Sequence, residues 1–323
     1  MSITDIDALN LLQSSPENGA PMIHCLTNPL AIQWMADAIL ALSARPMMAE
    51  HPQEVAAVTA GAGALLLNLG NLTDARMAGI RLAGQTADRL GLPIVLDPVG
   101  AAGSPFRLTF AMSLFKSVRP RIIKGNASEI ESLAVGRITA TGVDALPLSM
   151  AVRRSNAAQL AQMTGAVIVT TGPTDLITCA GGVTAVTGGS SMMGRITGSG
   201  CLAGAVIAAF AARLLPRPSA APPDGTGTPA GDGEPADAEP SGRSPAAPNT
   251  GRRAVGVQNR LCTAARLAMA VLAEAGEAAE ASLGPTGGSG SFRIHLLDQL
   301  TLFGRRDPAW PASAVLRHLT ALR

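Results

Sequence analysis

Five short apolar runs, each ending in polar or glycine-containing sequence, constrain the fold of this chain more than any other feature. They are PMIHCLT (21–27), ALLLNLG (64–70), PIVLDPVG (93–100), RIIKGN (121–126) and AVIVTTG (166–172). Helix-length stretches separate them, at 31–42, 74–90, 107–117, 127–134 and 149–164. This alternation predicts an α/β fold in which helices cover both faces of a mostly parallel sheet. The pair LITCA and GVTAVT (176–187), divided by Gly181, predicts an antiparallel hairpin at one edge.

The carboxyl ends of the five predicted strands share a polar character. They read Thr27-Asn28, Asn68-Leu69-Gly70, Asp97-Pro98, Lys124-Gly125-Asn126 and Thr170-Thr171-Gly172. In open parallel sheets, ligands bind beyond the carboxyl ends of the strands. We therefore expect these residues to meet along one ligand-binding rim.

Residues 216–252 differ from the rest of the chain because they contain almost no large apolar side chain. Such a segment buries too little surface to offset the entropy of ordering it, so we predict that it is disordered. A tolerated surface insertion is the favoured interpretation, and a regulatory or partner-binding role is the alternative. Helical patterns continue on both sides, which predicts a single domain over residues 1–323 with this insertion inside it.

Composition excludes two classes of partner. The formal net charge is only +2 and aromatic residues make up 2% of the chain, so neither a basic footprint nor a stacking platform for nucleic acid is expected. No apolar run approaches the ~20 residues that a membrane helix needs. We predict no nucleic-acid partner and no membrane partner.

The cysteines and the first residues favour a cytoplasmic protein. Cys25, Cys179, Cys201 and Cys262 lie far apart and form no CxxC pair, which predicts free thiols in a reducing compartment rather than disulfides or a zinc site. The start of the chain, MSITDIDALNLLQSSPENG, is polar and acidic, unlike a signal peptide.

The segment ITGSGCLAGAVIAAFAARLL (196–215) carries the strongest local signal for chemistry. A glycine-containing turn runs directly into an apolar helix, so the first-turn N–H groups of Gly198, Ser199, Gly200 and Cys201 are predicted to form an anion hole for a phosphate. No Gly-Lys-Ser/Thr follows, so the segment is not a Walker A loop. A glycine turn that merely caps a core helix is the alternative.

Cys201 stands at the start of this predicted helix. A helix N-terminus favours a thiolate, so we expect a lowered pKa for this thiol and a functional role. Most free cysteines are instead small buried apolar residues, which is the alternative for Cys201.

The segment IIKGNASEIESLA (122–134) provides a second candidate site. Asn126 and Glu129 have the spacing of a helix capping box, which needs no function to explain it. Glu129 would nevertheless lie on the rim beside Asp97, where two carboxylates and substrate phosphates could hold Mg²⁺. Lys124 is one of only two lysines in the chain.

Taken together, these segments resemble the hydroxyethylthiazole kinases, a family of the ribokinase-like superfamily. The resemblance covers roughly residues 20–215. It rests on HCLTNPLAIQWMADAILAL, RPMMAEHPQEV, ALLLNLGNLT, PIVLDPVGAAGSPFR, IIKGNASEIESLA, GVD, VIVTTGPTDLI and ITGSGCLAGAV, and continues weakly in GSGSFRIHLLDQL (288–300). LDPVG, KGNASE and TGSGC together are specific.

The resemblance implies a ribokinase-like fold of about nine strands, a homotrimer, and ATP-dependent phosphorylation of 4-methyl-5-(2-hydroxyethyl)thiazole in thiamine salvage. It implies roles position by position: Met48, Gly198 and Asn28 contact the thiazole; Lys124, Thr171 and Asn126 contact ATP; Asp97 and Glu129 lie near Mg²⁺ and the phosphates; Cys201 stands where related enzymes carry a catalytic Asp. Lys124 replaces an Arg common in the family.

Two alternatives stay open. The chain could be another ribokinase-like enzyme, which phosphorylates hydroxymethylpyrimidine or repairs hydrated nicotinamide nucleotides with ATP. It could also be a non-catalytic sensor that binds a thiazole or a nucleotide. The HCLTN and RPMMAE segments favour the thiazole kinase over the first, and Asp97, Glu129 and Cys201 oppose the second.

Overall fold

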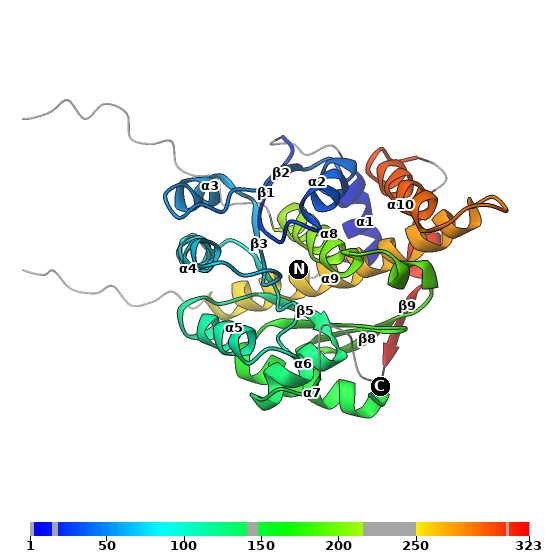
Figure 1. The fold of residues 1–323 in the computed structure, drawn as a ribbon. Helices are drawn as coiled ribbons and strands as arrows, with labels where there is room; N and C mark the ends of the chain where they lie inside the picture. The colour runs from blue at the N-terminus through cyan, green and yellow to red at the C-terminus, as the bar shows by residue number, and fades with distance from the viewer. Residues whose placement is uncertain (1–2, 15–18, 141–147, 216–249, 308–309, 323) are drawn as a thin grey trace, which may run out of the picture.

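The computed structural model describes residues 3–14, 19–140, 148–215, 250–307 and 310–322, and contains one nine-stranded sheet (Figure 1). The strands are β1 (Met22–Leu26), β2 (Arg45–Met47), β3 (Ala64–Asn68), β4 (Ile94–Asp97), β5 (Ile122–Asn126), β6 (Val167–Thr171), β7 (Asp175–Cys179), β8 (Gly182–Val186) and β9 (Leu319–Leu322). Their order is β2-β1-β3-β4-β5-β6-β7-β8-β9. Pairing is parallel from β2 to β6 and antiparallel from β6 to β9. The predicted α/β class, the mostly parallel sheet and the antiparallel hairpin are confirmed, but the hairpin does not form an edge of the sheet, because β9 pairs with β8.

Two helical layers cover the sheet because its central strands are apolar on both faces. Leu66 and Val95 belong to one buried cluster, whereas their neighbours Leu65, Leu67 and Ile94 belong to the other. The first cluster includes residues of α1 (Asp5–Gln13), α2 (Ile32–Ala41), α8 (Ser199–Leu214), α9 (Thr250–Ala281) and α10 (Ser289–Gly304). The second includes residues of α3 (Val55–Gly61), α4 (Asp74–Arg89), α5 (Pro105–Ser117), α6 (Ala127–Val135) and α7 (Met150–Thr164). Period-two alternation between two apolar faces is what a buried parallel sheet requires.

The expected insertion lies almost wholly outside the described residues. Residues 216–249 belong to that part, and α9 begins at Thr250, two positions before the expected end at 252. The helices on either side, α8 and α9, pack against each other.

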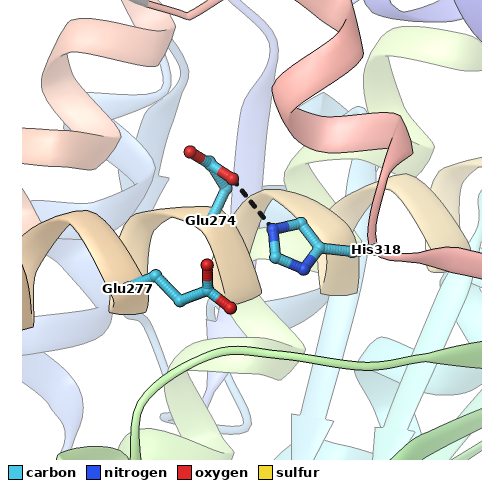
Figure 2. Close-up of side chains that lie close together, drawn as sticks. All are labelled: Glu274, Glu277 and His318. Carbon is cyan, nitrogen blue, oxygen red and sulfur yellow. Dashed lines mark hydrogen bonds and ion pairs between the residues drawn. The ribbon is translucent and has the colours of Figure 1, made fainter.

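The C-terminal residues complete the sheet. A short helix, α11 (Ala312–Leu316), leads into β9, which pairs with β8. Earlier in the chain, a 3₁₀ turn, η1 (Ser191–Arg195), precedes α8. His318, directly before β9, faces Glu274 of α9 (Figure 2). β2 and β9 therefore form the two edges of the sheet.

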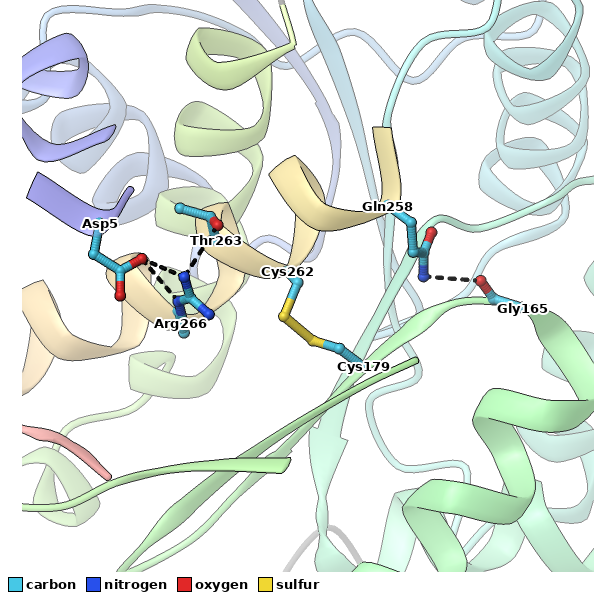
Figure 3. Close-up of a disulfide and its surroundings, with 7 residues drawn as sticks. All are labelled: Asp5, Gly165, Cys179, Gln258, Cys262, Thr263 and Arg266. Carbon is cyan, nitrogen blue, oxygen red and sulfur yellow. Dashed lines mark hydrogen bonds and ion pairs between the residues drawn. A yellow bond between two sulfur atoms is a disulfide. The ribbon is translucent and has the colours of Figure 1, made fainter. Parts of the chain in front are cut away.

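Two of the four cysteines form a disulfide, so the expectation of four free thiols was wrong. Cys179, at the end of β7, bonds to Cys262 of α9, with 6.1 Å between their Cα atoms (Figure 3). The two residues are 83 positions apart, and only the packing of α9 on the sheet brings them together. Cys25 and Cys201 are free and buried. In the described part of the chain, no helix combines the length and hydropathy that crossing a membrane requires.

Candidate active site

The polar strand ends meet on one rim, as the sequence predicts. Asn28 follows β1, Asn68 ends β3, Asp97 ends β4, and Lys124 lies in β5. All four side chains are buried, with at most 5% of their surface exposed. Cys201, in the first turn of α8, lies among them and accepts hydrogen bonds from two of them. This cluster is the centre of the candidate site.

A backbone N–H fixes the orientation of the two asparagine amides. Gly70 N donates to Asn68 Oδ1 at 2.9 Å, so the other end of that amide is the donor, and it reaches Asp97 Oδ2 at 3.1 Å and Cys201 Sγ at 3.2 Å. Because Asn68 Oδ1 also faces Asn28, the atom presented there is Asn28 Nδ2, at 3.2 Å, and it reaches Cys201 Sγ at 3.4 Å. Two amide donors thus point at the sulfur.

Asn68 was not among the candidate site residues. Its place at a strand end on the rim was the available signal, but no single-residue pattern indicates that its amide joins Cys201 to Asp97.

Asp97 and Lys124 form a fully buried ion pair. Lys124 Nζ donates to Asp97 Oδ1 at 2.9 Å and to the carbonyl of Gly200 at 3.0 Å. Burial raises the pKa of Asp97, and the Lys124 ammonium opposes that rise. Burial also disfavours the ammonium, but the nearby acidic groups, Asp97 first and Glu129 next, together outweigh it and the pKa of Lys124 is raised. Lys124 therefore places a positive charge beside the first turn of α8.

The expected lowering of the Cys201 pKa was wrong. Burial raises the pKa of this thiol, and the nearby Asp97 carboxylate raises it further, against the effects of Lys124 and the two asparagine amides. Only 8% of the Cys201 surface is exposed. Desolvation disfavours a buried thiolate more than the helix terminus favours it, so the thiol is neutral at pH 7.

Glu129 forms the predicted capping box and one further contact. Asn126 accepts a hydrogen bond from Glu129 N at 2.9 Å, and Glu129 Oε2 accepts one from Asn126 N at 2.8 Å. Its other oxygen accepts from Gly100 N, at 2.8 Å, in the turn after β4. Burial, followed by the charge of Asp97, raises the pKa of Glu129 to about 7. The surroundings therefore disfavour the ionised form of Glu129, and a cation bound beside this carboxylate would stabilise that form.

This pKa predicts that stability decreases between about pH 4.5 and pH 7. In that window the folded protein keeps the Glu129 proton while the unfolded chain releases it, so each rise in pH favours unfolding. A shift from 4.5 to about 7 corresponds to at most about 3 kcal/mol. Glu129→Gln, which cannot ionise, is expected to show a flatter profile in urea unfolding measured from pH 5 to pH 8. Parallel profiles for both proteins would contradict the raised pKa.

The start of α8 has the features expected of the anion hole. Gly198 is the N-cap residue at φ +86°, and a Cβ there would lie 3.2 Å from that of Ala31. The first bond within the helix runs from Leu202 N to Gly198 O. In the described chain no side chain caps this helix, which leaves the N–H groups of Gly200 and Cys201 facing outward for a ligand.

A cavity of about 660 Å³ opens beside this helix start. Thr171 and Asp175 lie at its edge near β6 and β7, Ser199 and Gly200 belong to α8, and a loop after β8 forms another part of the wall. Met269, Leu272 and Ala273 of α9 make its apolar side. Burial raises the pKa of Asp175 to about 6. Apolar walls with a few convergent polar groups are typical of small-molecule sites.

Met48 lies apart from the cavity. It follows edge strand β2 on the same rim and is partly buried against the first apolar cluster, which also contains Cys201. Thr171 ends β6, and its hydroxyl donates to Gly125 O at 3.3 Å. Hydrogen bonds thus connect five of the predicted site residues, partly through Asn68: Asn28, Asp97, Lys124, Gly200 and Cys201. Met48 lies to one side of this cluster and Thr171 to the other.

Comparison with known proteins identifies the relatives of this chain. The profile of the Hydroxyethylthiazole kinase family matches residues 14–217. The hydroxyethylthiazole kinase of Pectobacterium atrosepticum is 42% identical over 193 residues, which is 60% of this chain and 72% of that protein. The corresponding protein of Nitratidesulfovibrio vulgaris (strain DP4) is 42% identical over 194 residues, with 60% and 72% covered.

Solved structures show the same fold. The hydroxyethylthiazole kinase structure from Pyrococcus horikoshii OT3 superposes with a TM-score of 0.68 at 24% identity and covers 99% of both chains. A ribokinase-like superfamily protein from Enterococcus faecalis V583 has a TM-score of 0.55 at 13% identity, with 94% of this chain and 96% of that chain covered. With its family match, its ribokinase-like sheet and its TGSGC helix start, the chain belongs to the hydroxyethylthiazole kinase family.

Proposed function

We propose that this protein transfers the γ-phosphate of ATP to the hydroxyl of 4-methyl-5-(2-hydroxyethyl)thiazole, as a step of thiamine salvage. The observation that supports this most is the position of Cys201. It lies at the uncapped start of α8, accepts from Asn28 and Asn68 beside the Asp97–Lys124 pair, and directly follows Gly200, which lines the cavity. An acceptor hydroxyl and a transferring phosphoryl group would have to meet at a position such as that of Cys201.

The nucleotide and the alcohol would approach from opposite sides of Cys201. We assign the 660 Å³ cavity to ATP, with Thr171, Lys124 and the Asn126 turn near the phosphates. The thiazole would lie toward Asn28, Gly198 and Met48. The N–H groups of Gly200 and Cys201 would then face the transferring phosphoryl group, whereas the Ser199 N–H, expected in the same anion hole, donates to Ile196 O at 3.5 Å.

The residues on the rim fit a magnesium ion. Each oxygen of Asp97 and Glu129 accepts one hydrogen bond, which leaves acceptor capacity on both carboxylates, and Lys124 is their shared cation. Burial, followed by the charge of Asp97, raises the pKa of Glu129, and a cation bound beside it would favour its ionised form. Asp97 and Glu129 would hold Mg²⁺ together with phosphate oxygens, and the ion would neutralise charge on those phosphates.

In the reaction, the substrate oxygen attacks the γ-phosphorus, the bond to the β,γ-bridging oxygen breaks, and the hydroxyl proton is released. The transition state is loose, so positioning and charge neutralisation matter more than base strength. The neutral Cys201 thiol would contribute by position: both asparagine amides orient its sulfur. Lys124 would stabilise charge on the transferring group.

Cys201→Asp is expected to retain or raise turnover, because a carboxylate can accept the same two amide hydrogen bonds and is a stronger base than a neutral thiol. Cys201→Ala should lose part of the activity, at most about a hundredfold in kcat, the low end of what a general base contributes. Steady-state kinetics of both variants test this. Collapse of activity in the Asp variant would contradict the role given to the thiol.

The deciding experiment measures ADP release by the purified protein with MgATP, with and without the thiazole alcohol. Thiazole-dependent release above about 0.1 s⁻¹, roughly tenfold below the slow end of typical kinases, is expected. A panel with hydroxymethylpyrimidine and hydrated nicotinamide nucleotide tests the related enzymes. Thiazole binding without ADP release would instead favour the sensor.

We also propose a homotrimer in the cytoplasm. The exposed apolar side chains of Leu30, Ile32 and Met47, adjacent in sequence to Asn28 and Met48, support a subunit interface beside the thiazole end of the site. Light scattering should then give three times the monomer mass. The use of ATP as co-substrate supports the cytoplasmic location.

A further inference from the structure

We propose that Glu277 and His318 are positioning residues for nucleotide binding, because they hold the loop Thr187–Ser190 in place as a wall of the cavity. This inference rests on the assignment of that cavity to ATP. Gly188, Gly189 and Ser190 line it, together with Thr171 and Gly200. All the anchors of the loop lie in α9 or just before β9, beyond residue 217, where the family match ends.

The anchors are hydrogen bonds to the backbone of the loop. Glu277 Oε1 accepts from Gly189 N at 2.9 Å. His318 Nδ1 lies 2.7 Å from Thr187 O, and since a carbonyl only accepts, this nitrogen is the donor. A backbone bond from Thr187 N to His318 O, at 3.0 Å, completes the attachment. Figure 2 shows that Glu277 projects from α9 and His318 from the segment before β9, and that their side chains lie close together.

The loop fits its anchors closely. Gly188 and Gly189 have φ values of +91° and +85°, a region that glycine adopts at little cost. A Cβ at Gly188 would lie 2.4 Å from Glu277 Oε1 and 2.6 Å from His318 Nδ1. The position of these side chains therefore determines how far the loop extends into the cavity.

The same residues could suggest a metal site, since ligand atoms of Glu274, Glu277 and His318 lie within 4.8 Å of one another. The Arg317 guanidinium, however, donates to both carboxylates, at 2.7 Å and 2.8 Å, and His318 Nε2 lies 2.8 Å from Glu274. The Arg317 guanidinium is therefore already paired with both carboxylates. The cluster is explained as an anchor, and a metal ion would have to displace Arg317.

The test measures ATP binding to the purified full-length protein by calorimetry, independently of turnover. Glu277→Ala removes the acceptor for Gly189 N and is expected to raise the Kd for ATP about fivefold to tenfold, with the Kd for the thiazole alcohol unchanged. Glu277→Gln keeps an acceptor oxygen and should stay within about twofold of the native protein. Hydrogen exchange of residues 187–191 should accelerate only in the Ala variant.

Gly188→Ala tests the same wall without removing an anchor, and it remains informative if Glu277→Ala fails to fold. Its added Cβ should displace the loop and weaken ATP binding to a similar extent. Unchanged ATP affinity in Glu277→Ala or in Gly188→Ala, or equal weakening in the Gln variant, would overturn the inference. Failure of the native protein to bind ATP would instead overturn the proposed function, and the inference with it.

Discussion

Lys124→Met is expected to destabilise the protein by about 3–5 kcal/mol at pH 8, the usual effect of removing one partner from a buried ion pair. Asp97 is fully buried, and its carboxylate would be left with only the Asn68 amide as a side-chain hydrogen-bond donor. A protonated Asp97 needs no cation, so the loss should shrink as the pH falls. Urea unfolding at pH 8 and pH 5.5 measures both effects.

The chain offers a matched control for this variant. Lys116, the other lysine, lies exposed in the last turn of α5, and Lys116→Met should change stability by no more than about 0.5 kcal/mol. The double variant Asp97→Leu/Lys124→Met removes both charges and should recover much of the stability while remaining inactive. Native stability in Lys124→Met at pH 8 would show that Asp97 is not charged in the folded protein.

Reduction of the Cys179–Cys262 disulfide is expected to cost about 4.5 kcal/mol of unfolding free energy. The bond closes a loop across 83 positions, and the chain-entropy relation gives this value for a loop of that size. Urea unfolding with and without a dithiol reductant measures it. Two further thiols should titrate in the reduced protein besides Cys25 and Cys201.

The variant Cys179→Ser/Cys262→Ser is the control for that experiment. Its unfolding midpoint should be low and insensitive to the reductant, since its remaining cysteines form no disulfide. An unchanged midpoint in the native protein, with four thiols titrating, would contradict the expected contribution. In a reducing cytoplasm part of the protein would lack the bond.

The sequence predicts the central sheet and its rim because buried parallel strands are continuous apolar runs. Leu65, Leu66 and Leu67 of β3 are all fully buried, and the polar residue that ends such a run stands at the carboxyl edge. The edges of the sheet escape prediction for the opposite reason. β2 has only three residues with no buried position, and β9 is defined by pairing with β8 rather than by its own pattern.

The site is predictable in its residue types but not in its energetics. Cys201 stands out in the sequence because it begins a predicted helix. Asp97 and Lys124 stand out because they lie at the ends of predicted strands. Whether the Cys201 thiol ionises depends on how far the folded chain excludes water from it. A local sequence pattern does not predict this degree of burial. The same holds for Cys179 and Cys262, whose distance is set by how α9 packs on β7.

The disulfide also changes the connectivity of the molecule. Because it joins a residue before α8 to a residue within α9, the polypeptide between them forms a closed covalent ring. A single cleavage of the backbone anywhere between residues 180 and 261 opens that ring but leaves both fragments bonded. The oxidised protein can therefore be nicked between the two helices that flank the cavity wall and remain one covalent molecule.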